Sequence, residues 1–422
     1  MNYDEAIEYV HSIPWMGKGL GLKRIGALLL AVGNPENELK FIHVAGTNGK
    51  GSICEMTARI LESAGYKTGF FVSPYIHRFN ERMQINHRPI SDDELAELVG
   101  LLKPVAEKME DPPSEFEVIT AAAFLYFKKN KCDYVVLEVG MGGRLDATNV
   151  IGTPLAAVIA TIGLDHTKHL GNTVGEIAYE KAGIIKPAGD VVVYGQGGEA
   201  AQVFRRVSDE RGASLRFSDF TLIEALGEDD EFQYFKYKSG GSYSLSLHGE
   251  HQLKNAATVL ELVALLREKG VALSEKAVAD GLAGARWPGR FETLCIDPLF
   301  IVDGGHNPEG ALAAVAAFKR RYPGMRAVVL LGMTASKAVD EVIRIVDEIA
   351  VRYVVIEADT SRAMPKEQLF EEVQKLGKQV ETAKSVSAGV SRALELTKPA
   401  EASLAIGSLY TIAQIREYFG KE

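Results

Sequence analysis

The feature that most constrains the fold is a glycine-rich segment, residues 43–52, between a strand pattern and a helix pattern. An apolar run at 41–44 precedes it, and apolar residues at helical spacing follow it as far as Gly65. Glycines at such a turn let backbone N–H groups surround an anion, and the start of a helix attracts negative charge. The segment predicts an α/β fold with a phosphate-binding loop.

This phosphate loop (residues 46–52) has the spacing G-x-x-G-K-G-S rather than the commoner G-x-x-x-x-G-K-[ST]. Lys50 would supply a charge for the outer phosphates of a nucleotide, and Ser52 a hydroxyl for Mg²⁺. A plain surface loop is the alternative, but the flanking strand and helix favour a phosphate site. The predicted binding residues are Gly46, Thr47, Asn48, Gly49, Lys50, Gly51 and Ser52.

Strand and helix patterns alternate along most of the 422 residues, a length that suits two or three domains. This alternation predicts a mostly parallel sheet with helices on both faces. Residues 214–248 predict a small antiparallel subregion, because two aromatic-rich runs flank a Ser-Gly-Gly-Ser turn. A fresh alternation beyond Arg290 predicts a Rossmann-like second domain. We therefore expect an ATP-binding domain at 1–290 and a C-terminal α/β domain at 291–422.

The expected elements of this pattern fall into two sets. The strands are at 41–44, 69–72, 134–139, 155–162, 191–194, 299–303, 327–332, 353–357 and 402–406. The helices are at 53–64, 92–109, 115–129, 173–183 and 251–269.

Composition excludes several classes of protein. A net charge of −9 argues against nonspecific nucleic-acid binding. No run approaches 18 apolar residues, and the acidic N-terminus does not resemble a signal peptide. The three cysteines are scattered, which is typical of reduced thiols. We expect a cytoplasmic protein without a nucleic-acid or membrane partner.

Polar residues follow several of the expected strands, where open α/β sheets bind ligands. Glu138 ends a buried strand and is a candidate Mg²⁺ ligand, with a turn-capping carboxylate as the alternative. His166 follows the next strand; it could ligate metal, although a hydrogen-bonded structural histidine is commoner. Lys181, near a helix end, fits a solvated lysine that complements the helix dipole.

Two further turns carry charged side chains. The segment 73–82, here named the serine–proline loop, suits an anionic, ring-bearing substrate, with a plain surface loop as an equal alternative. Its candidate substrate residues are Ser73, Pro74, Arg78 and Arg82. In the second domain, Asp303 and His306 lie on a glycine turn that could also be a helix cap. Arg290 stands at the domain boundary and could bridge both domains.

Six segments occur in the order of one known family: GTNGKGS (46–52), SPYIHRFNER (73–82), EVGMGGRLDATN (138–149), GLDHTKHLG (163–171), EKAGIIK (180–186) and DGGHNPEG (303–310). From about residue 1 to 420 the chain resembles folylpolyglutamate synthase and dihydrofolate synthase, in the Mur ligase superfamily of ATP-dependent amide-forming enzymes. Within that superfamily, Gly51 between Lys50 and Ser52 points toward folate ligases.

The resemblance implies roles around ATP and metal. Lys50 would hold the ATP phosphates, Ser52 and Glu138 one Mg²⁺, and His166 a second. Lys181 matches a lysine that is carbamylated in this superfamily, which overturns the solvated interpretation.

Further positions match ligand contacts of the family. Asn255 and Arg290 match nucleotide-contacting residues, and Asp303 and His306 would reach ATP from the second domain. The serine–proline loop would lie near the pterin. Tyr75 stands where the family often has His, and its role is left open.

The reaction implied is ligation of L-glutamate to the carboxylate of tetrahydrofolate through an acyl phosphate, by a monomer. Synthesis of dihydrofolate from dihydropteroate is an open alternative. A Mur-type ligase for a cell-wall precursor and a nucleotide-hydrolysing switch are the rivals. A switch would release phosphate without folate and glutamate, whereas a ligase requires both.

Overall fold

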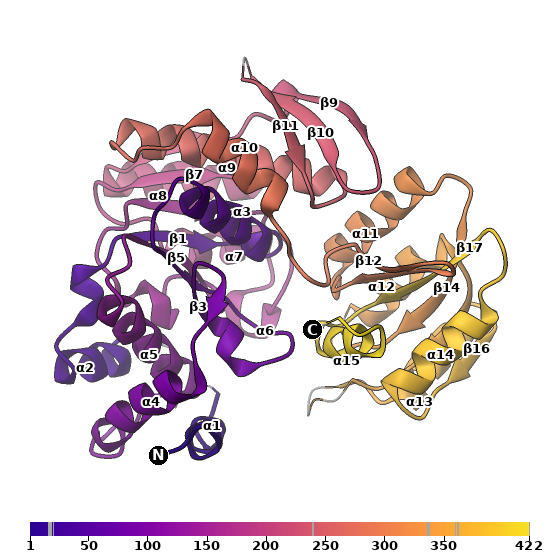
Figure 1. The fold of residues 1–422 in the computed structure, drawn as a ribbon, viewed down its shortest axis with the longest axis horizontal. Coiled ribbons are helices and arrows are strands. Elements are labelled where there is room, and N and C mark those ends of the chain that lie inside the picture. Colours follow the sequence, from indigo (N-terminus) through magenta and orange to yellow (C-terminus); the bar gives the residue numbers. More distant parts are fainter. Residues whose placement is uncertain are drawn as a thin grey trace. The chain divides into compact units, whose positions relative to one another are not determined.

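The computed structural model describes residues 1–15, 19, 21–238, 240–335, 338–358, 360 and 363–421. The chain forms two compact units (Figure 1). The first contains Met1–Ser246 and Leu253–Ala285, and the second contains Leu247–Gln252 and Arg286–Glu422. The main division therefore falls between Ala285 and Arg286.

The first unit is built on an eight-stranded sheet of order β4-β3-β2-β5-β1-β6-β7-β8. Its strands are β1 (Phe41–Ala45), β2 (Thr68–Phe71), β3 (Met83–Ile85), β4 (Arg88–Pro89), β5 (Tyr134–Glu138), β6 (Ala156–Ile159), β7 (Asp190–Val193) and β8 (Ser214–Phe217). The six strands from β2 to β8 in this order run parallel, and β3 pairs antiparallel with both β2 and β4. The prediction of a mostly parallel sheet is confirmed. Strand β1 lies centrally and is buried along its whole length, which explains its unbroken apolar run.

Helices cover both faces of this sheet. They are α1 (Tyr3–Ser12), α2 (Lys23–Ala31), α3 (Lys50–Ser63), α4 (Asp92–Ala106), α5 (Glu115–Lys129), α6 (Thr167–Leu170), α7 (Val174–Ala182), α8 (Gly198–Arg211), α9 (Glu250–Glu268) and α10 (Glu275–Gly284). Residues of α1, α2, α4 and α5 form one buried cluster with β1, β2 and β5, and α7 and α8 form another with β6 and β7. Helix α3 packs against β1, β2, β5 and α10.

A three-stranded antiparallel sheet, β11-β10-β9, belongs to the first unit. Strands β10 (Gln233–Tyr237) and β11 (Ser242–Leu245) confirm the predicted hairpin; Ser239 of its turn lies outside the described residues. The sequence did not predict β9 (Ile223–Glu228), which is mostly exposed and has too few apolar residues to show alternation.

The second unit has a six-stranded sheet of order β12-β13-β17-β14-β15-β16. Its elements are β12 (Glu292–Ile296), β13 (Leu299–Asp303), α11 (Pro308–Arg321), β14 (Arg326–Leu331), α12 (Val339–Asp347), β15 (Ala350–Val355), α13 (Lys366–Gln374), β16 (Val380–Thr382), α14 (Val386–Leu396), β17 (Glu401–Ile406) and α15 (Leu409–Tyr418). All pairings are parallel except that of β12 with β13. The predicted C-terminal α/β domain is confirmed as a fold.

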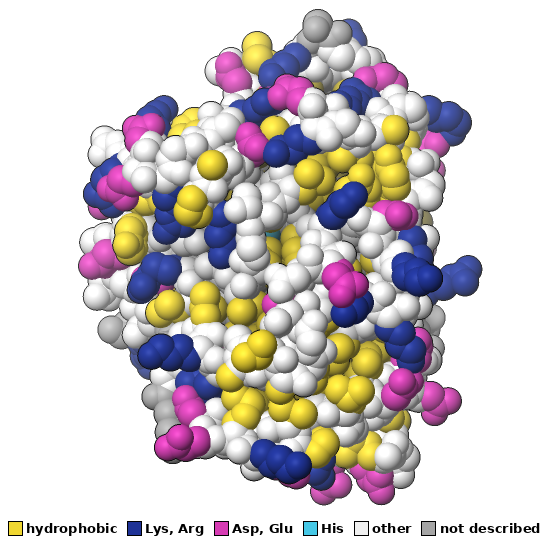
Figure 2. All heavy atoms as spheres, turned by 90° about the vertical axis from the view of Figure 1, so that its left-hand side faces the viewer, with side chains coloured by type: hydrophobic (Ala, Val, Ile, Leu, Met, Phe, Trp, Pro, Cys, Tyr) yellow, Lys and Arg dark blue, Asp and Glu magenta, His cyan; other side chains and the backbone are white. Residues whose placement is uncertain are grey.

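Four short 3₁₀ helices complete the described structure: η1 (Pro35–Glu38), η2 (Phe79–Arg82), η3 (Ala147–Val150) and η4 (Phe220–Leu222). Across the described ranges, no helix has the length and apolar content needed to cross a bilayer. On the face drawn in Figure 2, basic and acidic side chains are interspersed, with hydrophobic ones between them. This pattern differs from the single-sign stripe of a nucleic-acid-binding surface.

Candidate active site

The phosphate loop leaves the carboxyl end of β1 and leads directly into α3. It is fastened to the chain beyond β6: the Thr47 N–H donates to the Thr161 carbonyl at 2.7 Å, and the Gly163 N–H donates to Thr47 Oγ1 at 3.1 Å. A Cβ on Gly46 would lie 2.6 Å from the Ala160 Cβ, so glycine is required there. The loop is therefore a rigid turn held by two neighbouring strands.

Two lysine side chains converge on this loop. Lys50 Nζ donates to the carbonyl oxygens of Gly46 and Thr47 at 3.0 and 3.2 Å. Lys181, in the last turn of α7, is 4% exposed and donates from Nζ to the same Gly46 carbonyl at 2.7 Å. Burial, reinforced by the Lys50 charge, lowers the pKa of Lys181 to about 7. The burial of Lys181 excludes the solvated interpretation, which the family resemblance had already overturned.

The two candidate ligands of the first Mg²⁺ ion, Ser52 and Glu138, are buried oxygen donors. Ser52 lies in the first turn of α3, and Glu138 ends β5 in register with Val44 of β1. Glu138 also accepts a hydrogen bond from the Ser73 N–H at 3.1 Å. Mg²⁺ prefers oxygen ligands and usually combines one or two carboxylates with waters and substrate phosphates.

Within the described ranges, no three His, Cys, Asp or Glu residues form a group that could hold a metal. A cage made entirely of such side chains is therefore not built there. A Mg²⁺ ion shared with substrate phosphates fits Ser52 and Glu138.

His166, the third candidate metal ligand, has a left-handed backbone conformation and an exposed side chain. It has φ +48° and precedes α6, and its side chain is about half exposed. Its N–H donates to Asp165 Oδ1 at 2.8 Å, and its Nε2 lies 3.9 Å from Asp165 Oδ2. Exposure leaves the imidazole accessible to a ligand, whereas a core histidine would be enclosed.

Asn255 belongs to α9 and reaches the phosphate loop. It is 2% exposed, and a Cβ on Gly49 would lie 2.7 Å from its Oδ1. Gly49 also has φ +84°, which favours glycine. The structure thus brings Asn255, Lys50 and Lys181 to the same turn.

The serine–proline loop is organised by Glu81. The Glu81 carboxylate accepts hydrogen bonds from the N–H groups of Ile76, His77 and Arg78 at 2.8, 3.0 and 2.8 Å. Glu81 was not among the predicted site residues, although a carboxylate that follows a turn with several backbone N–H donors was a signal for it in the sequence.

The two arginines of the serine–proline loop have different surroundings. Arg78 is exposed, and its guanidinium donates to both Asp92 carboxylate oxygens at 2.8 and 3.0 Å. Arg82 is buried, and its guanidinium lies 5.0 Å from the ring centre of Tyr75 and 5.5 Å from that of Phe79. Only Arg82 is part of an enclosed aromatic cluster, and Tyr75 contributes to it.

In the second unit, the turn after β13 is ordered by its own side chains. Asp303 accepts from the N–H groups of Gly305 and Phe291 at 2.7 and 2.9 Å, and Asn307 Oδ1 accepts from the Gly310 N–H at 2.8 Å. Burial raises the pKa of Asp303, with the Arg290 charge opposing that rise. His306 Nδ1 lies 3.0 Å from the Gly304 carbonyl oxygen. Asn307 therefore caps α11, the alternative anticipated for this turn.

Comparison with known proteins covers both units. The Mur ligase middle domain model matches residues 44–263, and the Mur ligase, glutamate ligase domain model matches residues 289–409. Dihydrofolate synthase/folylpolyglutamate synthase of Bacillus subtilis (strain 168) is 37% identical, covering 98% of this chain and 98% of its own.

Two solved structures share the fold along almost the entire chain. Mycobacterium tuberculosis folylpolyglutamate synthase complexed with ADP and AMPPCP has a TM-score of 0.91 at 30% identity and covers 100% and 98% of the two chains. An FPGS–AMPPCP–folate complex has a TM-score of 0.86 at 32% identity and covers 99% of each. The similarity therefore extends through both the phosphate loop and the Asp303 turn.

Proposed function

We propose that this chain, which belongs to the folylpolyglutamate synthase/dihydrofolate synthase group of the Mur ligase family, adds L-glutamate to the carboxylate of tetrahydrofolate. The members of this group are ATP-dependent ligases. We further propose that it acts as a cytoplasmic monomer. The relatives' names favour this reaction over a cell-wall precursor ligase or a nucleotide switch.

The chemistry requires an activated carboxylate. A carboxylate resists attack by an amine because its charge repels the nucleophile and oxide is a very poor leaving group. A folate carboxylate oxygen therefore attacks the γ-phosphorus of ATP, which forms an acyl phosphate and releases ADP. The glutamate amine then attacks the acyl carbon, loses a proton and expels inorganic phosphate. The protein contributes positioning and neutralisation of the phosphate charge.

The observation that carries this proposal is the rigid phosphate loop with two converging amines. Lys50 binds the outer phosphates of ATP after leaving its two loop carbonyls. The start of α3 and the loop N–H groups bind the remaining phosphate oxygens. Ser52 and Glu138 would hold a Mg²⁺ ion, which would neutralise phosphate charge when bound.

Four further residues contact the nucleotide in this proposal. Asn255 touches the phosphate loop already, which supports its role in the first unit. In the second unit, the Arg290 guanidinium lies beside the turn that carries Asp303 and His306. Alanine variants of Arg290 and His306 should raise the KM for ATP more than that for glutamate.

We propose that Lys181 is carbamylated. A pKa of about 7 leaves much of the side chain as neutral amine at neutral pH, the form that attacks CO₂. The amine nitrogen bonds to the carbon of CO₂ and one proton leaves, which gives a carbamate with a negative charge. That carbamate and the exposed His166 together would hold a second Mg²⁺ ion.

Labelled bicarbonate tests the carbamate directly. The wild type should give a carbamate carbon resonance that disappears in Lys181→Ala. Lys186→Ala is the matched control, because Lys186 is also a partly buried lysine with its pKa lowered to about 8. Active enzyme without a carbamate signal would refute the modification.

The serine–proline loop binds the pterin-bearing substrate in this proposal. Glu81 orders its backbone, and the Ser73 N–H is fixed by Glu138, one of the proposed Mg²⁺ ligands. Arg82 and its aromatic neighbours offer ring surfaces and one buried cation. Since Arg78 is paired with Asp92, we expect Arg78→Ala to change the KM for folate less than Arg82→Ala does.

One sequence feature bears on the rival switch. Asn130-Lys131-Cys132-Asp133 matches the guanine-reading pattern [NT]-K-x-D. These residues precede β5, whereas the phosphate loop follows β1, which runs parallel to β5. The pattern therefore lies at the opposite edge of the sheet from the phosphate loop and cannot read a base bound there.

The deciding experiment measures phosphate release and product mass with ATP, L-glutamate and either tetrahydrofolate or dihydropteroate. A folate ligase releases phosphate only when all three substrates are present and yields a product one glutamate heavier. Dihydropteroate is included because the B. subtilis relative carries both activities in its name. Phosphate release without an acceptor or glutamate would contradict the proposal.

A further inference from the structure

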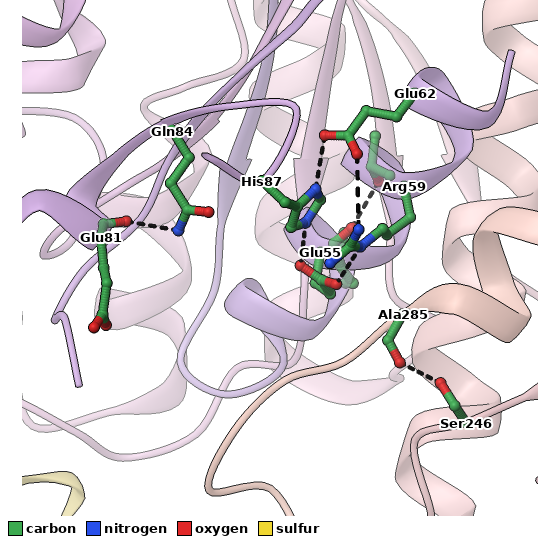
Figure 3. A network of polar contacts seen from close by, with 10 residues as sticks. Glu55, Arg59, Glu62, Glu81, Gln84, His87, Ser246 and Ala285 are labelled. Atoms are coloured by element: carbon green, nitrogen blue, oxygen red, sulfur yellow. Dashed lines mark hydrogen bonds and ion pairs between the residues drawn. The ribbon is translucent and has the colours of Figure 1, made fainter. Parts of the chain in front are cut away.

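His87 is held between two carboxylates of the helix that begins at the phosphate loop (Figure 3). Its Nε2 lies 2.6 Å from Glu55 Oε2, and its Nδ1 lies 2.7 Å from Glu62 Oε1. Arg59 pairs with the same two glutamates, at 2.9 and 3.9 Å. The His87 cluster is defined as Glu55, Arg59, Glu62 and His87. Three of its members lie on α3, and His87 lies on the hairpin at the edge of the sheet.

The two short contacts define the protonation state of the ring. A neutral imidazole has one N–H, so its other nitrogen would place a lone pair against a carboxylate oxygen. Both contacts are favourable only when His87 is an imidazolium. The charges that act on the His87 ring are those of Glu55 and Glu62, both on α3. On the side of β2, the ring faces the uncharged Phe70 ring, with 5.1 Å between the ring centres. Arg88, the next residue on the hairpin, is exposed.

The charge balance agrees with this assignment. Burial lowers the pKa of His87, but the hydrogen bonds that its ring donates to Glu55 and Glu62, together with their negative charges, outweigh burial and raise the pKa overall. Arg59 already pairs with both glutamates in a largely buried position, and the imidazolium adds a second positive charge beside these two carboxylates.

A continuous set of bonds connects the His87 cluster to the serine–proline loop. His87 lies in the turn between β3 and β4, and β3 pairs with β2. From β3, the Gln84 side-chain amide donates to the Glu81 carbonyl at 2.8 Å. Glu81 in turn accepts the N–H groups of residues 76–78. The other end of the cluster is α3, whose first turn carries Ser52.

We propose that the His87 imidazolium is a positioning residue, which fixes the serine–proline loop relative to the phosphate loop by bridging Glu55 and Glu62. This inference rests on the proposed ligase function, in which the two loops bind folate and ATP. His87 itself touches no substrate.

The kinetic test uses three variants. His87→Asn removes the cation and tolerates the left-handed backbone of residue 87 (φ +54°). It should raise the KM for tetrahydrofolate about tenfold with a much smaller change in kcat. Arg88→Asn, which removes a charge from the same hairpin outside the cluster, should leave both constants unchanged. His87→Lys, which keeps a cation, should recover most of the affinity for folate.

A second measurement is independent of catalysis. Hydrogen exchange of residues 76–89, corrected for intrinsic rates, should accelerate in the wild type as rising pH deprotonates His87. It should not do so in His87→Lys. Equal exchange in wild type and His87→Asn, or an unchanged KM for folate in a folded His87→Asn, would overturn the proposal. If ligation itself were absent, the exchange result would still decide whether the cluster orders the loop.

Discussion

The phosphate loop of the first unit and the Asp303 turn of the second occupy equivalent places, each at the end of a strand in a sheet whose strands run mostly parallel. Each follows the last residue of a buried strand and leads into a 14-residue helix. Their electrostatics are opposite. Lys50 and Lys181 donate to the first turn, whereas the Asp303 carboxylate accepts backbone N–H groups in the second.

The N-termini of α3 and α11, the helices that follow the two turns, also differ in how their backbone N–H groups are satisfied. The N-cap residue of α3 is Gly49, which makes no side-chain capping hydrogen bond, and the first turn of α3 has no acidic residue. Asn307 caps α11, and Glu309 lies in its first turn. A helix start without a cap attracts an external anion, whereas a capped start is already satisfied. The same strand–turn–helix geometry therefore gives one turn suited to phosphate and one that stabilises itself.

The largest expected effect comes from Lys50→Ala. It should lower ligation turnover by about 10³-fold, because it removes the cation that binds the outer phosphates. Initial rates with all three substrates measure the loss, and circular dichroism checks the fold. Lys40→Ala is the control, since Lys40 precedes β1 at the other end of the strand. Near-normal ligation by Lys50→Ala would contradict the assignment of the phosphate loop.

In the second unit, Asp303→Ala should act on stability as well as on catalysis. It leaves the buried N–H groups of Phe291 and Gly305 without their acceptor, at a cost of about 2–4 kcal/mol. Hydrogen exchange over residues 289–310 measures that local loss in the absence of nucleotide. Unchanged protection there would show that Asp303 does not order its own turn, and the contrast between the two turns would weaken.

Lys181→Met should stabilise the first unit by about 1–3 kcal/mol at pH 6 in CO₂-free buffer, because a buried cation is removed. The pKa of Lys181 is lowered from 10.5 to about 7. Between pH 7 and pH 10.5, the Lys181 amine is therefore protonated in the unfolded chain but neutral in the folded protein. Because the unfolded state binds more protons, the free energy of unfolding of the wild type rises with pH in this range. Denaturant unfolding should show the advantage of Lys181→Met shrinking from pH 7 toward pH 10. A constant advantage would indicate that charge is not its cause.

The sequence predicted the elements that are buried and regular. Strands such as β1 and β5 show unbroken apolar runs because both faces are covered, and the glycine pattern at 46–52 located the phosphate loop. Weak elements were missed: β9 is exposed, and β3 and β4 are too short to show a period.

Side-chain direction was the harder problem for the site. Lys181 is buried because of how α7 packs, and Arg78 pairs with Asp92 across a loop. Neither fact follows from local sequence. The family resemblance, rather than residue patterning, was what selected Lys181.

The smallest expected effect separates capping from ligand binding. Asn307→Ala should cost about 1 kcal/mol of stability in the second unit, because the Gly310 N–H loses its acceptor at the start of α11. Asn307→Ser keeps a capping oxygen and should recover most of that loss, as measured by hydrogen exchange over α11. Since α3 lacks such a cap, tripolyphosphate should protect α3 from exchange far more than α11. Equal protection of both helices would mean that the two turns do not differ as anion sites, and the electrostatic contrast between them would have to be abandoned.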